Sequence, residues 1–240
     1  MSIKMIMPGA FEFKPDDKED DDSEEYYDRL RWSGIPEEYK KWCRLSTFEM
    51  VDGRQEGFEA ACWFIRGEIK PPMLLLYGEP GRSKTHLAAA IGLSFLAQLK
   101  TVLYYHVGEL LDDLRAGIRV ERLLSPGEID TRCATSILNR CKSFRLLILD
   151  DLGAENETDW ACEKLDIIVN HRYENALPTV ITSNTLDISD RIRDRCRHGL
   201  VVRLTGESYR EIIARRKVEQ RGINGKLDEA KKLKGKRSVS

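Results

Sequence analysis

The segment Leu74–Thr85 carries residue types that can hold a chain of phosphate groups. It reads Leu-Leu-Leu-Tyr-Gly-Glu-Pro-Gly-Arg-Ser-Lys-Thr. Gly78, Lys84 and Thr85 match the pattern G-x-x-x-x-G-K-[ST], but Ser83 stands where the pattern has its second glycine. Backbone N–H groups, a helix N-terminus and a nearby cation together hold a polyphosphate, and this segment offers all three. The chemistry that these residues indicate is nucleotide binding.

Each position of this loop has an expected task. Lys84 is expected to reach the β- and γ-phosphates and Thr85 to ligate Mg²⁺. The nucleotide-binding residues predicted here are Gly78, Glu79, Pro80, Gly81, Arg82, Ser83, Lys84, Thr85 and His86. The alternative is a Gly/Pro turn that only connects a strand to a helix. Lys84 and Thr85 argue against this alternative, because such a turn does not require them.

Ser83 determines how strongly the loop can bind. A Cβ at this position costs little if φ is negative, but on the order of 1 to 3 kcal/mol if the loop requires a glycine-only conformation. A factor of ten or more in nucleotide affinity therefore depends on the backbone at Ser83.

Two acidic residues end a second apolar run. Asp150 and Asp151 follow residues 146–149, which have the composition of a buried strand. In a phosphoryl-transfer site one carboxylate serves the metal and another orients the attacking water. We assign Asp150 to Mg²⁺ and Asp151 to the water or its proton, with Glu155 as a weaker substitute. Two acids that merely terminate a strand are the alternative.

Asn184 and a group of arginines complete the set of candidate catalytic residues. An amide at Asn184 can donate to the γ-phosphate or hold the attacking water, unless it only caps the next turn. Four arginines follow on a predicted helix, where alternate residues cannot all face one ligand: Arg191, Arg193, Arg195 and Arg197. One or two of them are expected to be catalytic, by stabilising the charge on the γ-phosphate bound to a neighbouring subunit. Arg210 is expected to contact the nucleotide bound to its own chain. Solvated surface arginines are the alternative.

Strand and helix patterns alternate around these residues. Strands are predicted at 74–77, 101–107, 145–151, 178–184 and 200–204. Helices are predicted at 36–42, 55–66, 86–97, 109–115, 125–139 and 160–173, with a basic turn at 115–119. The alternation predicts an α/β fold with a mainly parallel sheet flanked by helices. Its ligand site should lie beyond the carboxyl ends of the strands.

The composition excludes several classes of protein. The chain has 240 residues and no apolar run that approaches the ~20 residues of a membrane-spanning helix. Its N-terminus lacks the apolar stretch of a secretory signal, so we expect a cytoplasmic protein without a membrane segment. The six cysteines are dispersed without a C-x-x-C pair, which favours reduced structural residues over a zinc site or disulfides.

Charge is uneven along the chain, although the net charge is −1. Nine acids and one lysine fall between Asp16 and Asp28, a composition that cannot bury enough apolar surface to fold alone. We predict a disordered acidic arm at residues 1–33, a folded domain at 34–215 and a basic helix or tail at 216–240. Such a tail contacts nucleic acid in some proteins, and in others it only increases solubility.

In their order along the chain, these segments resemble the AAA+ ATPases of the DnaC/IstB group, which are bacterial and phage helicase loaders and transposition helper proteins. Gly34–Pro36 is similar to the start of that family's domain, residues 78–87 to its Walker A loop and residues 146–153 to its Walker B strand. The Arg-Tyr pair and sensor 1 match residues 172–184, the arginine-finger box residues 190–195 and sensor 2 residues 206–210.

The resemblance implies an AAA+ P-loop core across residues 34–215 that binds ATP and Mg²⁺ between subunits. It implies Arg195 as the arginine finger and Arg210 as the sensor 2 residue. It also implies contact with single-stranded DNA, self-association through the ATP interface, and a replicative helicase or a transposase as partner.

We therefore predict an ATP-dependent AAA+ protein that assists DNA replication as a helicase loader does, by ATP-switched assembly on single-stranded DNA and a partner. An IstB-like transposition helper ATPase is one alternative. A non-hydrolysing adaptor, with nucleotide use weakened by Ser83, is another. A small-molecule P-loop kinase would leave Asp150, Asp151, Asn184 and the arginine segment without a task.

Overall fold

The computed structural model describes residues 24–125, 128, 130–153, 158–209, 211, 212 and 215. A five-stranded sheet forms its centre, in the spatial order β2-β3-β4-β1-β5, and all neighbouring strands in it are parallel. The strands are β1 (Met73–Tyr77), β2 (Val102–His106), β3 (Leu146–Leu152), β4 (Thr179–Ser183) and β5 (Leu200–Arg203). The prediction of an α/β fold with a parallel sheet is confirmed.

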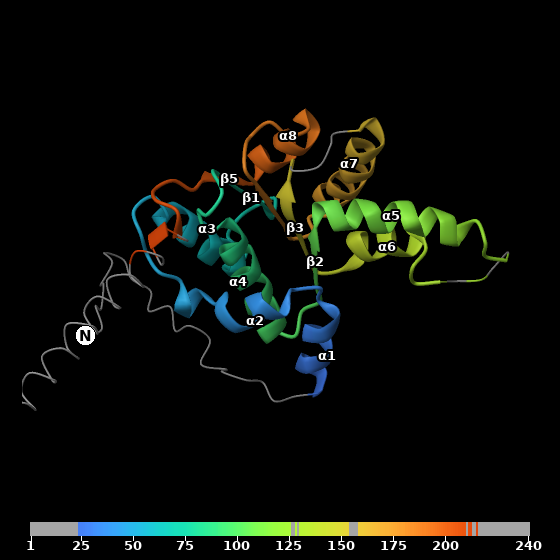
Figure 1. Ribbon diagram of the computed structural model, residues 1–240, viewed down its shortest axis with the longest axis horizontal. Helices are drawn as coiled ribbons and strands as arrows, with labels where there is room; N and C mark the ends of the chain where they lie inside the picture. Colours follow the sequence, from blue (N-terminus) through green and yellow to red (C-terminus); the bar gives the residue numbers. More distant parts are fainter. Residues whose placement is uncertain are drawn as a thin grey trace, which may run out of the picture.

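Helices cover both faces of this sheet (Figure 1). One layer holds α1 (Glu24–Trp32), α2 (Glu37–Trp42), the short 3-10 helix η1 (Leu45–Thr47), α3 (Gln55–Arg66) and α4 (Lys84–Ala97). The other holds α5 (Val107–Glu121), α6 (Ala134–Ser143), α7 (Asp159–Glu174) and α8 (Asp190–His198).

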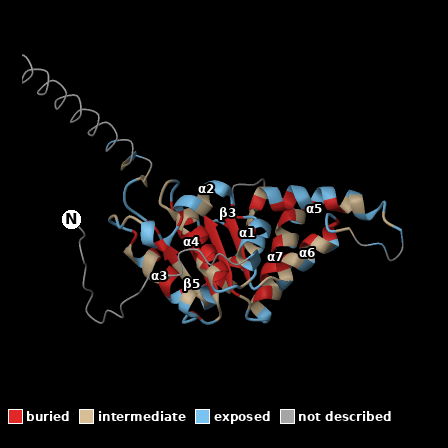
Figure 2. Cartoon of the chain, turned by 90° about the horizontal axis from the view of Figure 1, so that it is seen from below, coloured by how far each residue is buried: buried red, intermediate tan, exposed pale blue. Residues whose placement is uncertain are grey.

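Alternate residues of each strand enter two different hydrophobic cores. Leu74 and Leu76 of β1 belong to the core beneath α3 and α4, whereas Met73 and Leu75 belong to the core beneath α5 to α8. Figure 2 shows the buried residues on the strands and on the inward sides of the helices. A parallel sheet buried on both faces favours strands that are mainly apolar, as β1 and residues 146–149 of β3 are.

The structure corrects the predicted disordered arm at residues 24–32, which form α1. Arg29 pairs with Glu25 one turn earlier at 2.7 Å, and Tyr26 and Leu30 pack against the core beneath α4. The acidic composition describes the segment in isolation, but in the folded chain the apolar side of α1 gains a partner. The arm before residue 24 and the predicted tail at 216–240 lie outside the described residues.

Two other predicted boundaries are wrong. The basic turn at 115–119 is part of α5, which continues because Gly117 allows close packing, with a Cβ there lying only 2.6 Å from the backbone N of Ala134. The helix predicted from residue 125 begins instead at Ala134, after Cys133 caps it. Helix α3 matches its predicted span and ends at Gly67, which has a φ of +75°.

All six cysteines are free thiols, and all except Cys162 are buried. Within the described part of the chain, no helix combines the length and the apolar character needed to cross a membrane.

Candidate functional site

The strand order brings the predicted site residues together. Strand β4 lies between β1 and β3, so the loop after β1, the acids of β3 and the polar end of β4 meet at one edge of the sheet. The carboxyl ends of parallel strands form the ligand-binding edge of such sheets.

Both glycines of the loop are required by its geometry. Gly78 has a φ of +144°, and a Cβ there would collide with the carbonyl oxygen of Leu204. Gly81 has a φ of +80°, and its carbonyl oxygen accepts the N–H of Tyr209 at 2.9 Å. The loop is therefore packed directly beneath residues 204–209, and side chains at these two positions would separate the two segments.

Ser83 adopts the left-handed conformation, with φ +65° and ψ +20°. Glycine enters this region freely, whereas a residue with a Cβ does so at roughly 1–2 kcal/mol. Ser83 is also the N-cap of α4, yet its side chain forms no capping hydrogen bond. The first N–H groups of α4 are thus not occupied by their own cap, as anion binding at a helix N-terminus requires.

Lys84 lies inside the loop and is 6% exposed. Its Nζ donates to the carbonyl oxygens of Gly78 at 2.6 Å and Glu79 at 3.1 Å, and to Oδ1 of Asn184 at 2.8 Å. Burial lowers the pKa of Lys84, and the nearby carboxylates of Asp151 and Asp150 oppose that effect. The structure thus brings the predicted lysine and the predicted asparagine into direct contact.

The Thr85 hydroxyl and the Asp150 carboxylate lie in contact, as two oxygen ligands of one magnesium ion would. The Thr85 hydroxyl lies 3.0 and 3.1 Å from the two carboxylate oxygens of Asp150. Asp150 is 4% exposed and also accepts hydrogen bonds from Thr182 at 2.6 Å and Tyr104 at 2.7 Å. A hydroxyl beside a carboxylate is an all-oxygen donor set, which suits Mg²⁺. Among the described residues no three His, Cys, Asp or Glu side chains gather as a metal site, so a bound nucleotide would have to supply further ligands.

A β-bulge or similar irregularity in β3 gives Asp151 a different backbone conformation and different hydrogen-bond partners from Asp150. The pairing of β3 with β4 shifts register between Leu149 and Leu152, and Asp151 has a φ of +60°. Its backbone N–H donates to Thr182 Oγ1 at 2.9 Å, and its Oδ1 accepts the amide of Asn184 at 2.8 Å. The two acids therefore face different surroundings, as their different predicted tasks require.

Other loop residues are held by local contacts. Glu79 and Arg82 form an ion pair at 2.5 Å. The His86 ring lies 3.2 Å from the carbonyl oxygen of Arg44 and stands edge-on to Phe48, and burial lowers its pKa.

Arg195 lies on α8 and contacts α7. Its guanidinium stacks over the ring of Tyr173 at 4.9 Å and donates to Asn170 at 3.2 Å. It borders a cavity of about 300 Å³ between these helices, which also contains Asp166 and Arg191. Within the described residues it makes no hydrogen bond to Lys84, Asn184 or Asp151. Arg210 and Glu155 lie outside the described residues.

Sequence reasoning missed three buried polar residues near the site. Tyr104 and Thr182 both donate to Asp150. Arg54 is fully buried and donates to the carbonyl oxygens of Gly81 at 3.4 Å and Glu207 at 2.7 Å. The spacing of these residues along the chain gives no signal for the contacts, because the partners come from distant parts of the chain.

Comparison with known proteins adds a family match. The model of a family described as IstB-like ATP binding protein matches residues 49–217. This span contains the phosphate-binding loop, both acids of β3, Asn184 and the arginines of α8.

Three relatives match between 57% and 71% of this chain. An uncharacterised protein, YqaM of Bacillus subtilis, is 29% identical over 194 residues, covering 71% of this chain and 57% of its own length. The replicative helicase loader DnaC of Escherichia coli is 28% identical over 57% of this chain and 55% of its own. A putative insertion sequence ATP-binding protein of Sinorhizobium fredii is 30% identical over 67% of this chain and 52% of its own. The chain thus spans about half the length of the relatives it matches.

Solved structures share the fold. A crystal structure of DnaI has a TM-score of 0.53 and 27% identity, covering 73% of this chain and 94% of that one. A structure of the replication initiator DnaA bound to AMPPCP and single-stranded DNA has a TM-score of 0.59 and 21% identity, covering 75% and 55%.

Proposed function

Because the chain belongs to the IstB-like ATP-binding protein family, we propose that it is an ATP-hydrolysing AAA+ protein that assists DNA replication. It binds ATP, and the state of the nucleotide controls its assembly on single-stranded DNA and on a partner protein. The observation that carries this proposal is the joining of Lys84, Asn184 and Asp151 by direct hydrogen bonds, beside the contact between Thr85 and Asp150.

The chain's own residues divide the work of hydrolysis. The N–H groups at the start of α4 and the ammonium group of Lys84 bind the phosphates. Asp151 accepts the proton or orients the attacking water, and Asn184 holds Asp151 while contacting Lys84. Thr85 and Asp150 hold Mg²⁺, which supplies charge stabilisation to the phosphates when bound.

Arg195 acts from a neighbouring subunit. Its described contacts are with Tyr173, Asn170 and Asp194 rather than with Lys84, which supports delivery to the γ-phosphate of a second copy. Stacking on Tyr173 and the bond to Asn170 hold the guanidinium in place, which reduces the entropy lost when it engages a phosphate. A complete site then needs two subunits.

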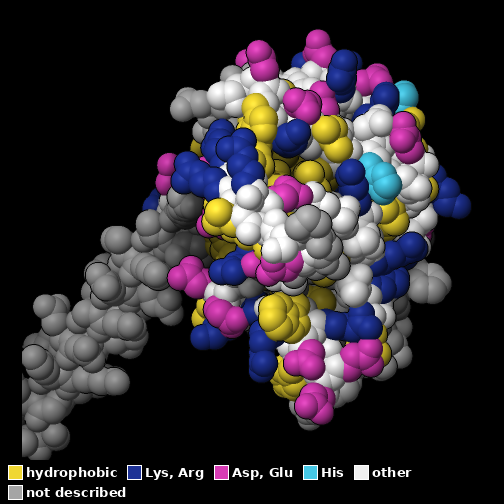
Figure 3. All heavy atoms as spheres, turned by 90° about the vertical axis from the view of Figure 1, so that its right-hand side faces the viewer, with side chains coloured by type: hydrophobic (Ala, Val, Ile, Leu, Met, Phe, Trp, Pro, Cys, Tyr) yellow, Lys and Arg dark blue, Asp and Glu magenta, His cyan; other side chains and the backbone are white. Residues whose placement is uncertain are grey.

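Helix α5 contributes to binding single-stranded DNA. Arg115, Arg119 and Arg122 are exposed and spaced four and three residues apart, which places them on one side of the helix. Figure 3 shows this end of the molecule, where basic side chains stand among acidic ones. Electrostatic contact with a phosphate backbone is the task that such residues can perform.

Binding and turnover of ATP, measured with and without single-stranded DNA, test this proposal. We expect turnover to rise with DNA. Arg119→Glu should weaken DNA binding for all sequences alike and lower the slope of log affinity against log salt by about 1 or more. Arg66→Glu, at the exposed end of α3, is the matched control and should change neither quantity. No ATP binding by the wild-type chain at millimolar concentration would refute the proposal.

The family match and the insertion sequence relative support a second candidate, a helper ATPase for transposition. DNA-stimulated turnover is common to both, so the partner distinguishes them. Turnover that responds to a replicative helicase supports the first, and turnover that responds to a transposase supports the second.

Ser83 raises the other alternative, an adaptor with weakened nucleotide use. The folded chain itself already holds Ser83 in the left-handed region. The strain at Ser83 therefore lowers the stability of the folded chain rather than its affinity for nucleotide. We expect Ser83→Gly to raise the free energy of unfolding by about 0.5 to 1 kcal/mol, and to change ATP affinity by less than about threefold. Denaturant unfolding and ATP titration measure the two effects.

Ala176→Gly is the matched control for this substitution. Ala176 also has a positive φ, +47°, but lies in the loop before β4. It should show a similar stability gain and unchanged nucleotide affinity. A gain in affinity of about tenfold in Ser83→Gly would instead favour the adaptor, in which the serine has weakened nucleotide use.

A further inference from the structure

Hydroxyl groups from three elements hold the carboxylate of Asp150. Thr85 at the start of α4 contacts both oxygens, Thr182 of β4 donates to Oδ1 at 2.6 Å, and Tyr104 of β2 donates to Oδ2 at 2.7 Å. Within the described residues Asp150 has no ion-pair partner, although it is 4% exposed. Such a carboxylate depends on hydrogen bonds or on a metal ion to compensate its charge.

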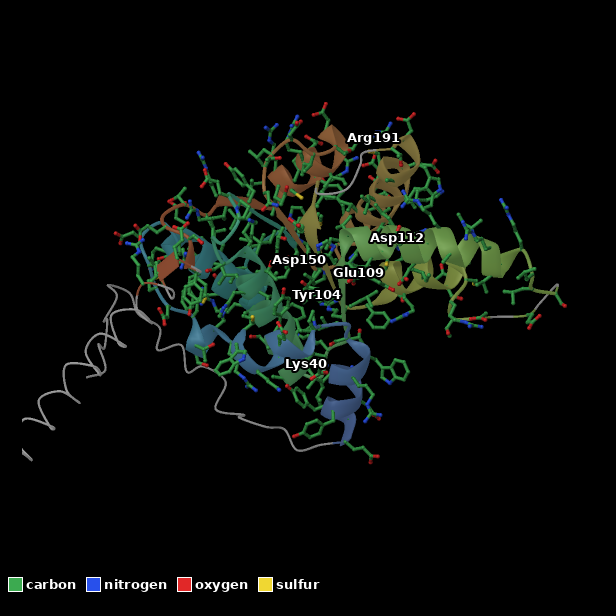
Figure 4. All side chains as sticks on the ribbon, viewed as in Figure 1. Lys40, Tyr104, Glu109, Asp112, Asp150 and Arg191 are labelled. Carbon is green, nitrogen blue, oxygen red and sulfur yellow. The ribbon has the colours of Figure 1, made fainter. Side chains whose placement is uncertain are left out.

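Tyr104 is the donor dedicated to Asp150. Thr85 is itself a proposed Mg²⁺ ligand, and Thr182 also accepts the N–H of Asp151. The phenol of Tyr104 bonds to Asp150 alone among the described residues. The two residues come from the neighbouring strands β2 and β3, and Figure 4 labels them near one another at the centre of the molecule.

Residues 33–39 contact both the backbone and the ring of Tyr104. Its backbone N–H donates to the carbonyl oxygen of Ser33 at 2.7 Å, and its ring stands edge-on to Tyr39, with 6.3 Å between centroids. Gly34 fits against it so closely that a Cβ would lie 2.5 Å from the Tyr104 carbonyl oxygen. The backbone contacts fix Tyr104 on β2, and burial of the ring together with its contact to Tyr39 restricts where the hydroxyl group lies.

We propose that Tyr104 is a positioning residue that orients the Asp150 carboxylate for Mg²⁺. This inference rests on the proposed function, since it concerns the same nucleotide site. With the phenol on Oδ2, rotation of the carboxylate is restricted, and the metal meets its ligand in one orientation. Hydrogen bonds to a ligating group from outside the metal shell typically change metal affinity 10- to 100-fold.

A purely structural role predicts something different. If the hydrogen bond only compensates a buried charge, its loss lowers the stability of the fold and leaves the response to Mg²⁺ unchanged. Metal dependence and stability must therefore be measured on the same variant.

Tyr104→Phe removes the hydroxyl group and keeps the ring, so the packing around Gly34 and Tyr39 is retained. The test measures the affinity of the full chain for a non-hydrolysable ATP analogue over a series of Mg²⁺ concentrations and in a chelator, with thermal unfolding alongside. We expect the Mg²⁺ concentration for half-maximal enhancement of binding to rise about tenfold or more, with metal-free binding unchanged. Tyr105→Phe, the same change at the next residue of β2, should match the wild type.

An unchanged Mg²⁺ response in Tyr104→Phe would overturn the positioning role, even if the melting temperature falls. An equal shift in Tyr105→Phe would also overturn it, because the effect would then not belong to the contact with Asp150. Failure of the wild-type chain to bind the analogue at any Mg²⁺ concentration is a separate result, which removes the proposed function and the positioning role with it.

Discussion

Replacing Arg172 by methionine is expected to lower the free energy of unfolding by about 3 to 5 kcal/mol. Arg172 is fully buried on α7. Its guanidinium donates to the carbonyl oxygens of Cys141, Phe144, Arg145 and Pro178 and to the hydroxyl of Thr179. These acceptors lie at the end of α6 and the starts of β3 and β4, so one side chain joins three segments.

The expected loss of stability is large because the substitution leaves the hydrogen-bond acceptors of Arg172 in place. Methionine fills much of the volume but donates no hydrogen bond. The carbonyl oxygens of Cys141, Phe144 and Arg145 would lose the donor that Arg172 supplies, and that of Pro178 would keep only the N–H of Leu147 at 3.2 Å. Burial lowers the pKa of Arg172 to about 10, so the group is still charged near neutral pH and its bonds are charge-assisted.

Urea unfolding of Arg172→Met measures the loss, with Arg145→Met as the control. Arg145 is exposed, and its side chain makes no described hydrogen bond, so the same substitution should change stability by no more than about 0.5 kcal/mol. Arg172→Lys should recover only part of the loss, because an ammonium group cannot reach all of these acceptors. A loss below about 1 kcal/mol in Arg172→Met would contradict the joining role.

Lys84→Ala is expected to weaken ATP binding by about 30-fold or more, since truncating a buried hydrogen-bonded charge costs about 2 to 5 kcal/mol. The ammonium group is held at the sheet edge by loop carbonyl oxygens and by Asn184, within reach of a phosphate bound at the start of α4. Without it, the loop loses its buried ammonium group, which is the charge expected to bind the phosphates.

Calorimetric titration with ATP measures this effect, and Lys100→Ala supplies the control. Lys100 follows the opposite end of α4 and contacts Phe95 and Gln98. The same substitution there should leave ATP affinity unchanged. Wild-type affinity in Lys84→Ala, with the chain still folded by circular dichroism, would show that nucleotide is not bound at this loop.

The local parts of the site could be predicted from the sequence. A loop of fixed spacing after an apolar strand indicates Lys84 and Thr85, and acids at the end of a strand indicate Asp150 and Asp151, because these signals need only neighbouring residues. The structure joins Lys84 to Asn184 and Thr85 to Asp150. Their catalytic roles stay predictions.

The other contacts depend on the order of strands in space. Nothing in the spacing of Tyr104 or Thr182 indicates that β2 and β4 flank β3, so their contacts with Asp150 could not be foreseen. The prediction of disorder at residues 24–32, which form α1, is wrong for a related reason. Composition reports whether a segment folds alone, whereas α1 is stabilised by the core beneath α4.

The carbonyl oxygen of Ser33 also bears on the solubility of the chain. Strand β2 is an edge of the described sheet, and an edge strand with open N–H groups is a template on which another molecule can add a strand. By accepting the N–H of Tyr104, Ser33 occupies a position that an intruding strand would use. A shortened chain beginning after Gly34 would lose this cover and should aggregate through β2, even with every nucleotide-binding residue intact.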